Sequence, residues 1–74
     1  MTKLPRISGK DLVKVFLKLG YCLDHQTGSH MILRHKNSPY RRLTIPHHPE
    51  IAKGTLLAIM KQAGLTRKEF LNLL

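Results

Sequence analysis

The sequence predicts an α+β domain in the order α-β-β-β-α, in which helices pack on one face of a three-stranded antiparallel sheet. Segments near both ends carry apolar residues at helical spacing, and three short segments between them have strand-like patterns. The connections between those strands are too short for a crossover, so the strands are expected to form an antiparallel meander. With 74 residues and no linker or repeat, residues 1–74 are expected to form a single domain.

The first helix is predicted over residues 9–19. Ser8 and Asp11 form an S-x-x-D pattern, which is typical of a capped helix start. Apolar residues then recur at i, i+3, i+4 and i+7 and make one helical face: Leu12, Val15, Phe16 and Leu19. Gly20 is the expected end of this helix because glycine tolerates the left-handed conformation.

Three strands are predicted next, over residues 21–26, 30–36 and 41–45. In the first strand, Tyr21 and Leu23 are expected on one side of the sheet, and Asp24 and Gln26 on the other. Residues 27–29 are a tight connection, and a second turn cluster precedes the third strand. Proline follows the third strand and cannot continue its ladder, because it has no backbone N–H.

The last third of the chain is predicted to be helical. In residues 54–64, one face collects the apolar side chains Leu56, Ile59, Met60 and Ala63. Gly64 ends that helix, and Thr66 and Glu69 then make a T-x-x-E capping box for a short last helix over residues 67–74. The helices are expected to cover the apolar side of the sheet, because a three-stranded meander needs that side buried.

The chain is strongly basic, with 13 Lys and Arg against 4 Asp and Glu and a formal net charge of +9. This excess favours a polyanionic partner such as nucleic acid. Membrane binding is not expected, since the longest apolar run, residues 56–60, is far too short to span a bilayer and no signal-like stretch is present. The single cysteine, Cys22, fits a reducing compartment, so a cytoplasmic protein is expected, with this thiol buried or half-buried.

Basic side chains gather in two groups that are candidate contacts to RNA. In the first helix, lysines recur every four residues and line one stripe, where they meet either solvent or phosphates: Lys10, Lys14 and Lys18. Four more basic residues lie in or beside the second and third strands, near the turn that joins them: Arg34, Lys36, Arg41 and Arg42. A domain this small has a thin core and no room for a deep cofactor pocket, so no cofactor is expected.

The predicted order of elements is also the plan of double-stranded-RNA-binding domains, which contact RNA through backbone phosphates and 2′-hydroxyls. A shared order of helices and strands is by itself only an analogy to those domains and does not establish a function. Five stretches add a likeness in sequence: SGKDLVKVFLKLGY (8–21), GSHMIL (28–33), RRLTIPHH (41–48), KGTLLAIMKQAGL (53–65) and RKEFL (67–71). In their order and spacing they resemble the HicA-like (YcfA-like) family of small toxins, the RNA-cleaving partners of toxin–antitoxin pairs.

This resemblance implies a fold similar to the double-stranded-RNA-binding domain, cleavage of mRNA, and an antitoxin partner of the HicB type that covers the site. The family motif G-S-H aligns with Gly28, Ser29 and His30, and its histidine is the catalytic residue. The P-x-H motif aligns with Pro46 and His48. One departure is His25, where many family members have a basic side chain such as Arg.

The chemistry of RNA cleavage also suits His30. An RNA strand carries its own nucleophile, the 2′-hydroxyl, and cleavage needs a group that removes its proton or protonates the leaving oxygen. Imidazole has an unperturbed pKa of about 6.5, which suits both tasks near neutral pH. Gly28 lets the backbone approach a phosphate, and Ser29 supplies a hydroxyl and an amide donor. We therefore expect His30 to act as general base or acid in a reaction that leaves a 2′,3′-cyclic phosphate or its hydrolysis product.

The other histidines have different expected roles. His48 is a candidate second acid–base group or RNA contact, whereas His25 and His35 are expected on the sheet surface or its edge. No metal site is predicted at His47 and His48, because adjacent residues of an extended chain point to opposite sides. Two alternatives remain open: a module that binds RNA without cutting it, with His30 as a structural turn residue, and a DNA-binding accessory protein.

Overall fold

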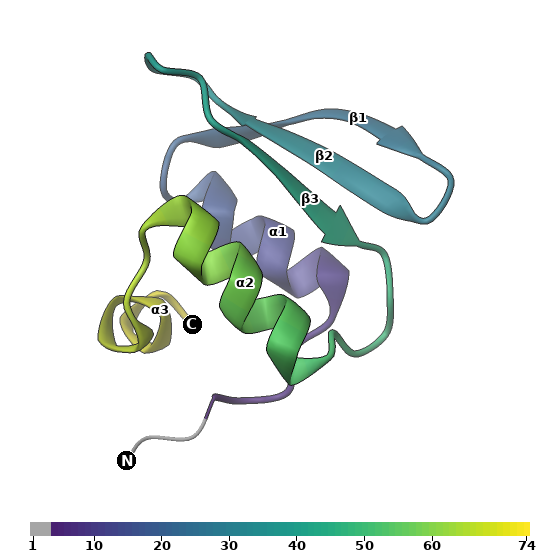
Figure 1. The fold of residues 1–74 in the computed structure, drawn as a ribbon, viewed down its shortest axis with the longest axis vertical. Helices are drawn as coiled ribbons and strands as arrows, with labels where there is room; N and C mark the ends of the chain where they lie inside the picture. Colours follow the sequence, from purple (N-terminus) through teal and green to yellow (C-terminus); the bar gives the residue numbers. More distant parts are fainter. Residues whose placement is uncertain (1–3) are drawn as a thin grey trace.

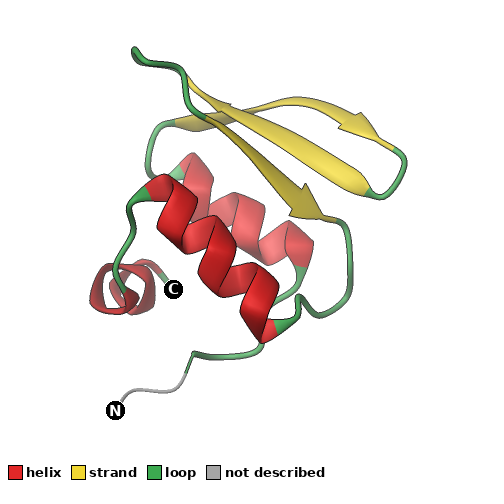
Figure 2. Ribbon diagram, viewed as in Figure 1, coloured by secondary structure: helices red, strands yellow, loops and turns green. Residues whose placement is uncertain are grey.

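A computed structural model describes residues 4–74. Its elements follow the order α1 (Gly9–Leu17), β1 (Tyr21–Thr27), β2 (His30–His35), β3 (Arg42–Pro46), α2 (Lys53–Ala63) and α3 (Arg67–Leu73). The helices α1 and α2 lie against one face of the sheet, and α3 lies away from it (Figures 1 and 2). The predicted α-β-β-β-α order, with its short last helix, is therefore confirmed. Within residues 4–74, no helix is both long and apolar enough to cross a bilayer.

The sheet is an antiparallel meander in the order β1-β2-β3. Its buried side chains belong to the hydrophobic core that the sheet shares with α1 and α2: Tyr21, Met31, Leu33, Leu43 and Ile45. Because side chains alternate along a strand, the positions between them point to the opposite side. We call that opposite side the open face. Apart from Asp24, it carries Cys22, His25, Thr27, His30, Ile32, Arg34, Arg42, Thr44 and Pro46.

A β-bulge interrupts the pairing of β1 with β2. Leu23 pairs with Leu33 and His25 pairs with Ile32, so Asp24 is an extra residue in β1. The bulge shifts the alternation by one residue, and Gln26 consequently pairs with the buried Met31 on the side of the helices. The expectation that Gln26 shares a side with Asp24 is therefore wrong.

The helix ends follow the local signals in the sequence. The Ser8 hydroxyl accepts a hydrogen bond from the Asp11 amide at 3.1 Å, as the S-x-x-D pattern predicts. The Thr66 and Glu69 pair forms both hydrogen bonds of a capping box, and Gly64 ends α2 with a φ of 69°. The first helix ends at Leu17 instead of residue 19, because the amide N–H groups that follow bond only three residues back.

The core lies between the sheet and the helices and contains no buried polar side chain among residues 4–74. Leu12, Phe16 and Phe70 are fully buried, so α3 contributes to the same core as α1. Lys18 Nζ also donates to the Leu73 carbonyl at 2.8 Å, which fastens the end of α3 to α1. The expected burial of Cys22 is wrong: this thiol lies on the open face, and it is exposed.

Candidate active site

The β1–β2 hairpin presents His30 to solvent. Gly28 has a φ of 53°, in the left-handed region that favours glycine, and His30 is the first residue of β2. On the open face His30 lies between Thr27 of β1 and Pro46 of β3, its direct partners in the sheet. The buried neighbour Met31 holds the strand from the other side. The imidazole is therefore exposed on a backbone that two neighbouring strands fix in place.

Backbone hydrogen bonds join the G-S-H turn to the segment that follows β3. The His47 amide donates to the Ser29 carbonyl at 2.6 Å, and the Gly9 amide donates to the His48 carbonyl at 2.9 Å. In addition, Gln26 Nε2 contacts His47 Nδ1 at 3.3 Å. Three segments far apart in sequence, namely the start of α1, the hairpin and the P-H-H segment, therefore meet at one end of the sheet. His48 is exposed, and a role for its imidazole stays a prediction.

The bulge in β1 builds a second polar cluster on the open face. His25 Nδ1 donates to Asp24 Oδ2 at 2.9 Å, and Arg34 Nη2 lies 3.7 Å from Asp24 Oδ1. The hydrogen bond from His25 and then the charge of Arg34 lower the pKa of Asp24 below its ordinary value. Asp24 is thus an ionised carboxylate with one oxygen on an imidazole and the other near a guanidinium. The pattern of apolar residues did not predict this cluster. The only feature of the sequence that could have indicated it is that Asp24 and His25 are adjacent.

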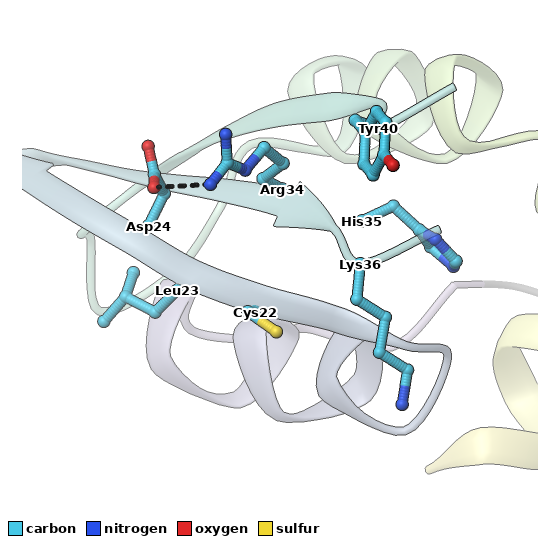
Figure 3. Close-up of a pocket in the computed structure, with 7 residues that line it drawn as sticks. All are labelled: Cys22, Leu23, Asp24, Arg34, His35, Lys36 and Tyr40. Atoms are coloured by element: carbon cyan, nitrogen blue, oxygen red, sulfur yellow. Dashed lines mark ion pairs between the residues drawn. The ribbon is translucent and has the colours of Figure 1, made fainter. Parts of the chain in front are cut away.

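A shallow groove of about 490 Å³ adjoins this cluster (Figure 3). Its lining comes from β1, β2 and the loop after β2: Cys22, Leu23, Asp24, Arg34, His35, Lys36 and Tyr40. The Tyr40 side chain is 57% exposed at the rim, and its backbone has a positive φ of 58°. The groove combines cationic side chains with an exposed aromatic ring, which are the two features that contact phosphates and bases in single-stranded RNA.

The candidate RNA-binding residues divide between two surfaces. Arg34 and Arg42 pair directly across β2 and β3 on the open face, the same face as His30. Lys36 lies in the loop after β2, and Arg41 Nη1 donates to the Gln62 carbonyl of α2 at 3.2 Å. The lysine stripe of α1 is exposed, but it belongs to the helical layer and lies away from the open face: Lys10, Lys14 and Lys18.

His35 is part of the structural framework. Its Nε2 donates to the Leu19 carbonyl at 3.0 Å, its Nδ1 accepts from the Asn37 amide at 3.0 Å, and its ring packs edge-on against Tyr21. The expectation that His35 lies on the sheet surface or edge is therefore wrong, because β2 turns this half-buried side chain towards the helices. His25 does lie on the surface of the sheet. Across residues 4–74, no group of three or more His, Cys, Asp or Glu side chains is arranged to hold a metal ion.

The fold and the exposed, positively charged sheet face define a small basic domain with the double-stranded-RNA-binding-domain-like fold. The family model of the HicA toxin of bacterial toxin–antitoxin systems matches residues 9–65, which is most of the chain. The chain therefore belongs to the HicA toxin family and is the toxin of a toxin–antitoxin system. A search of curated proteins found no match.

Proposed function

We propose that the protein is an endoribonuclease that cleaves mRNA by using His30 as an acid–base group and needs no metal or cofactor. The position of His30 carries this proposal: an exposed imidazole on a rigid hairpin, on the same sheet face as Arg34 and Arg42. The matched family supplies the biological setting of a toxin. The G-S-H turn that presents His30 lies within the matched residues.

In the proposed reaction, His30 takes the proton of a 2′-hydroxyl, and the resulting oxygen attacks the adjacent phosphorus. Arg34 lies four residues along β2, about 13 Å from His30 at roughly 3.3 Å per residue, so it serves phosphates that flank the cleaved one. Together with Arg42 it supplies affinity that depends on salt but not on base sequence. The expected products are a 2′,3′-cyclic phosphate and a 5′-hydroxyl.

We also propose that the toxin acts in the cytoplasm and that a HicB-type antitoxin inhibits it by covering the open face. The excess of positive charge favours fast association with an acidic partner. Co-expression of the neighbouring acidic gene product is expected to relieve growth arrest. Toxicity that persists although a stable complex forms would contradict occlusion of the site.

The direct test replaces His30 with alanine and uses Thr55→Ala, an exposed change on α2, as a matched control. Because His30 is exposed, the substitution should change the free energy of unfolding by no more than about 0.5 kcal/mol. Loss of an acid–base group should slow cleavage by about 10²–10⁴-fold, while RNA binding remains. The control should cleave like the wild type.

A second measurement uses an RNA with a 2′-deoxynucleotide at the mapped cleavage position, which should resist the wild-type protein. A folded wild-type protein that binds RNA but cleaves none would favour the alternative, a non-catalytic RNA-binding module. Full cleavage by a folded His30→Ala protein would refute the catalytic role of His30.

A further inference from the structure

The Asp24–His25 pair has the geometry of an oriented acid–base group. The bulge puts both side chains on the open face, and the 2.9 Å hydrogen bond ties His25 Nδ1 to the Asp24 carboxylate. Asp24 is held in turn by Arg34 at 3.7 Å. The carboxylate therefore fixes the orientation of the ring through Nδ1, and Nε2 is the ring nitrogen that this hydrogen bond leaves available. The His25 side chain is 53% exposed, which allows contact with a bound strand.

The register of the sheet places His25 beside His30. His25 pairs with Ile32, and His30 lies two residues before Ile32 on the same strand and the same face. The two histidines are thus diagonal neighbours across β1 and β2, a relation in which side chains lie about 7–8 Å apart. Two imidazoles at such a spacing can reach opposite sides of one phosphodiester group.

Cleavage by a 2′-hydroxyl needs two proton transfers in the same step, and a single imidazole such as that of His30 can carry out only one of them. One group must accept the proton of the nucleophile, and another must give a proton to the 5′-oxygen that leaves. A carboxylate stabilises a protonated imidazole through a charge-assisted hydrogen bond. His25 has that partner in Asp24, whereas the direct sheet partners of His30 are the uncharged Thr27 and Pro46.

From this juxtaposition we infer that His25 is the general acid of the reaction and His30 the general base, with Asp24 as a positioning residue. The inference rests on the proposed ribonuclease function. A neutral His30 nitrogen removes the 2′-hydroxyl proton while the 2′-oxygen forms a bond to phosphorus. The bond from phosphorus to the 5′-oxygen breaks, its electron pair stays on that oxygen, and His25 Nε2 delivers the proton. A 2′,3′-cyclic phosphate and a 5′-hydroxyl result, and solvent returns both histidines to their starting forms.

The test compares two substrates that differ in one atom. After the cleavage site has been mapped with the wild-type protein, the same RNA is synthesised with sulfur in place of the 5′-oxygen at that site. A thiolate leaves without protonation, so this substrate does not need the general acid. His25→Ala should cleave the ordinary RNA about 10²–10⁴-fold more slowly than the wild type. On the sulfur substrate it should approach the wild-type rate, whereas His30→Ala should remain slow on both.

Thr55→Ala is again the matched control, because Thr55 is exposed on α2 and lies outside both the groove and the open face, and it should cleave both substrates like the wild type. Asp24→Asn should lower kcat more than it raises KM, and the sulfur substrate should restore its rate. Melting temperatures close to that of the wild type would show that these variants are folded.

The outcomes separate the two proposals. If the wild-type protein cleaves neither substrate, the proposed function is wrong. If the wild type cleaves and His25→Ala matches it on ordinary RNA, the inference about His25 is overturned while that about His30 stands. A His25→Ala protein that is equally slow on both substrates would also overturn it, because His25 would then act before the leaving step.

Discussion

Replacing Gly9 with alanine sets two physical effects against each other. Gly9 is the first residue of α1, and intrinsic helix propensity favours alanine over glycine by up to about 1 kcal/mol. A Cβ at this position, however, would overlap the carbonyl oxygen of Pro46 and lie 3.1 Å from Met31 Cε. The methionine tip can move, but the carbonyl belongs to the backbone at the end of β3.

The carbonyl of Pro46 cannot move freely. Pro46 pairs with His30 in the sheet, and the next residues are fixed by the bonds from His47 to Ser29 and from Gly9 to His48. Forcing an extra methyl group into a packed site costs about 1–3 kcal/mol, and the upper part of that range, about 2–3 kcal/mol, applies here because the overlapping atom belongs to the backbone. A gain in propensity of up to about 1 kcal/mol offsets part of this cost. We therefore predict that Gly9→Ala lowers the free energy of unfolding by about 1–2 kcal/mol.

Thermal unfolding followed by circular dichroism measures this effect. For a domain of this size, each kcal/mol lost corresponds to a fall in Tm of about 4–8 °C. Gly54→Ala is the matched control, because Gly54 also lies in the first turn of a helix and a Cβ there meets nothing within 4 Å. The control should equal or exceed the wild type. A Gly9→Ala protein at least as stable as the wild type would refute the argument that the start of α1 is packed against the end of β3.

Four further outcomes are expected. Thr66→Ala should cost about 0.5–2 kcal/mol, measured by urea unfolding. The hydrogen bond with the Thr66 backbone lowers the pKa of Glu69 in the folded protein. The contribution of the ionised Glu69 carboxylate to the free energy of unfolding is therefore present above the ordinary pKa of Glu and is lost as the pH falls through the lower pKa of the folded state. Glu69→Gln should abolish this pH dependence. Phe70→Ala should cost about 3–5 kcal/mol by the same unfolding assay, since Phe70 is fully buried. Arg42→Ala should reduce, by about 1, the magnitude of the slope in a plot of the logarithm of RNA affinity against the logarithm of salt concentration. An unchanged slope would show that Arg42 does not contact an RNA phosphate.

Much of the fold could be predicted because its signals are local. The caps at Ser8 and Thr66 need partners only three residues away, and Gly64 ends α2 through its own backbone conformation. The role of His35 could not be predicted in this way. Its hydrogen-bond partner, the Leu19 carbonyl, lies 16 residues away, and its neighbours in sequence are basic residues that suggest a solvated surface.

The candidate site was predicted unevenly for the same reason. Resemblance to a family identified the G-S-H and P-x-H motifs, and the structure shows that backbone hydrogen bonds join the segments that contain them. The same resemblance marked His25 only as a departure. Its contact with Asp24 depends on the pairing of two strands, which neither motif nor periodicity encodes.

The bulge explains why periodicity cannot reveal this pair. In a regular strand, adjacent side chains point to opposite faces, so Asp24 and His25 could not meet on one face of the sheet. The extra residue in β1 removes that restriction and lets the pair face the same side as His30. The core fixes this arrangement, because a slip of β2 by one residue would expose Met31 and Leu33 and bury His30. The apolar side chains that stabilise the fold thus also select the register that presents both histidines.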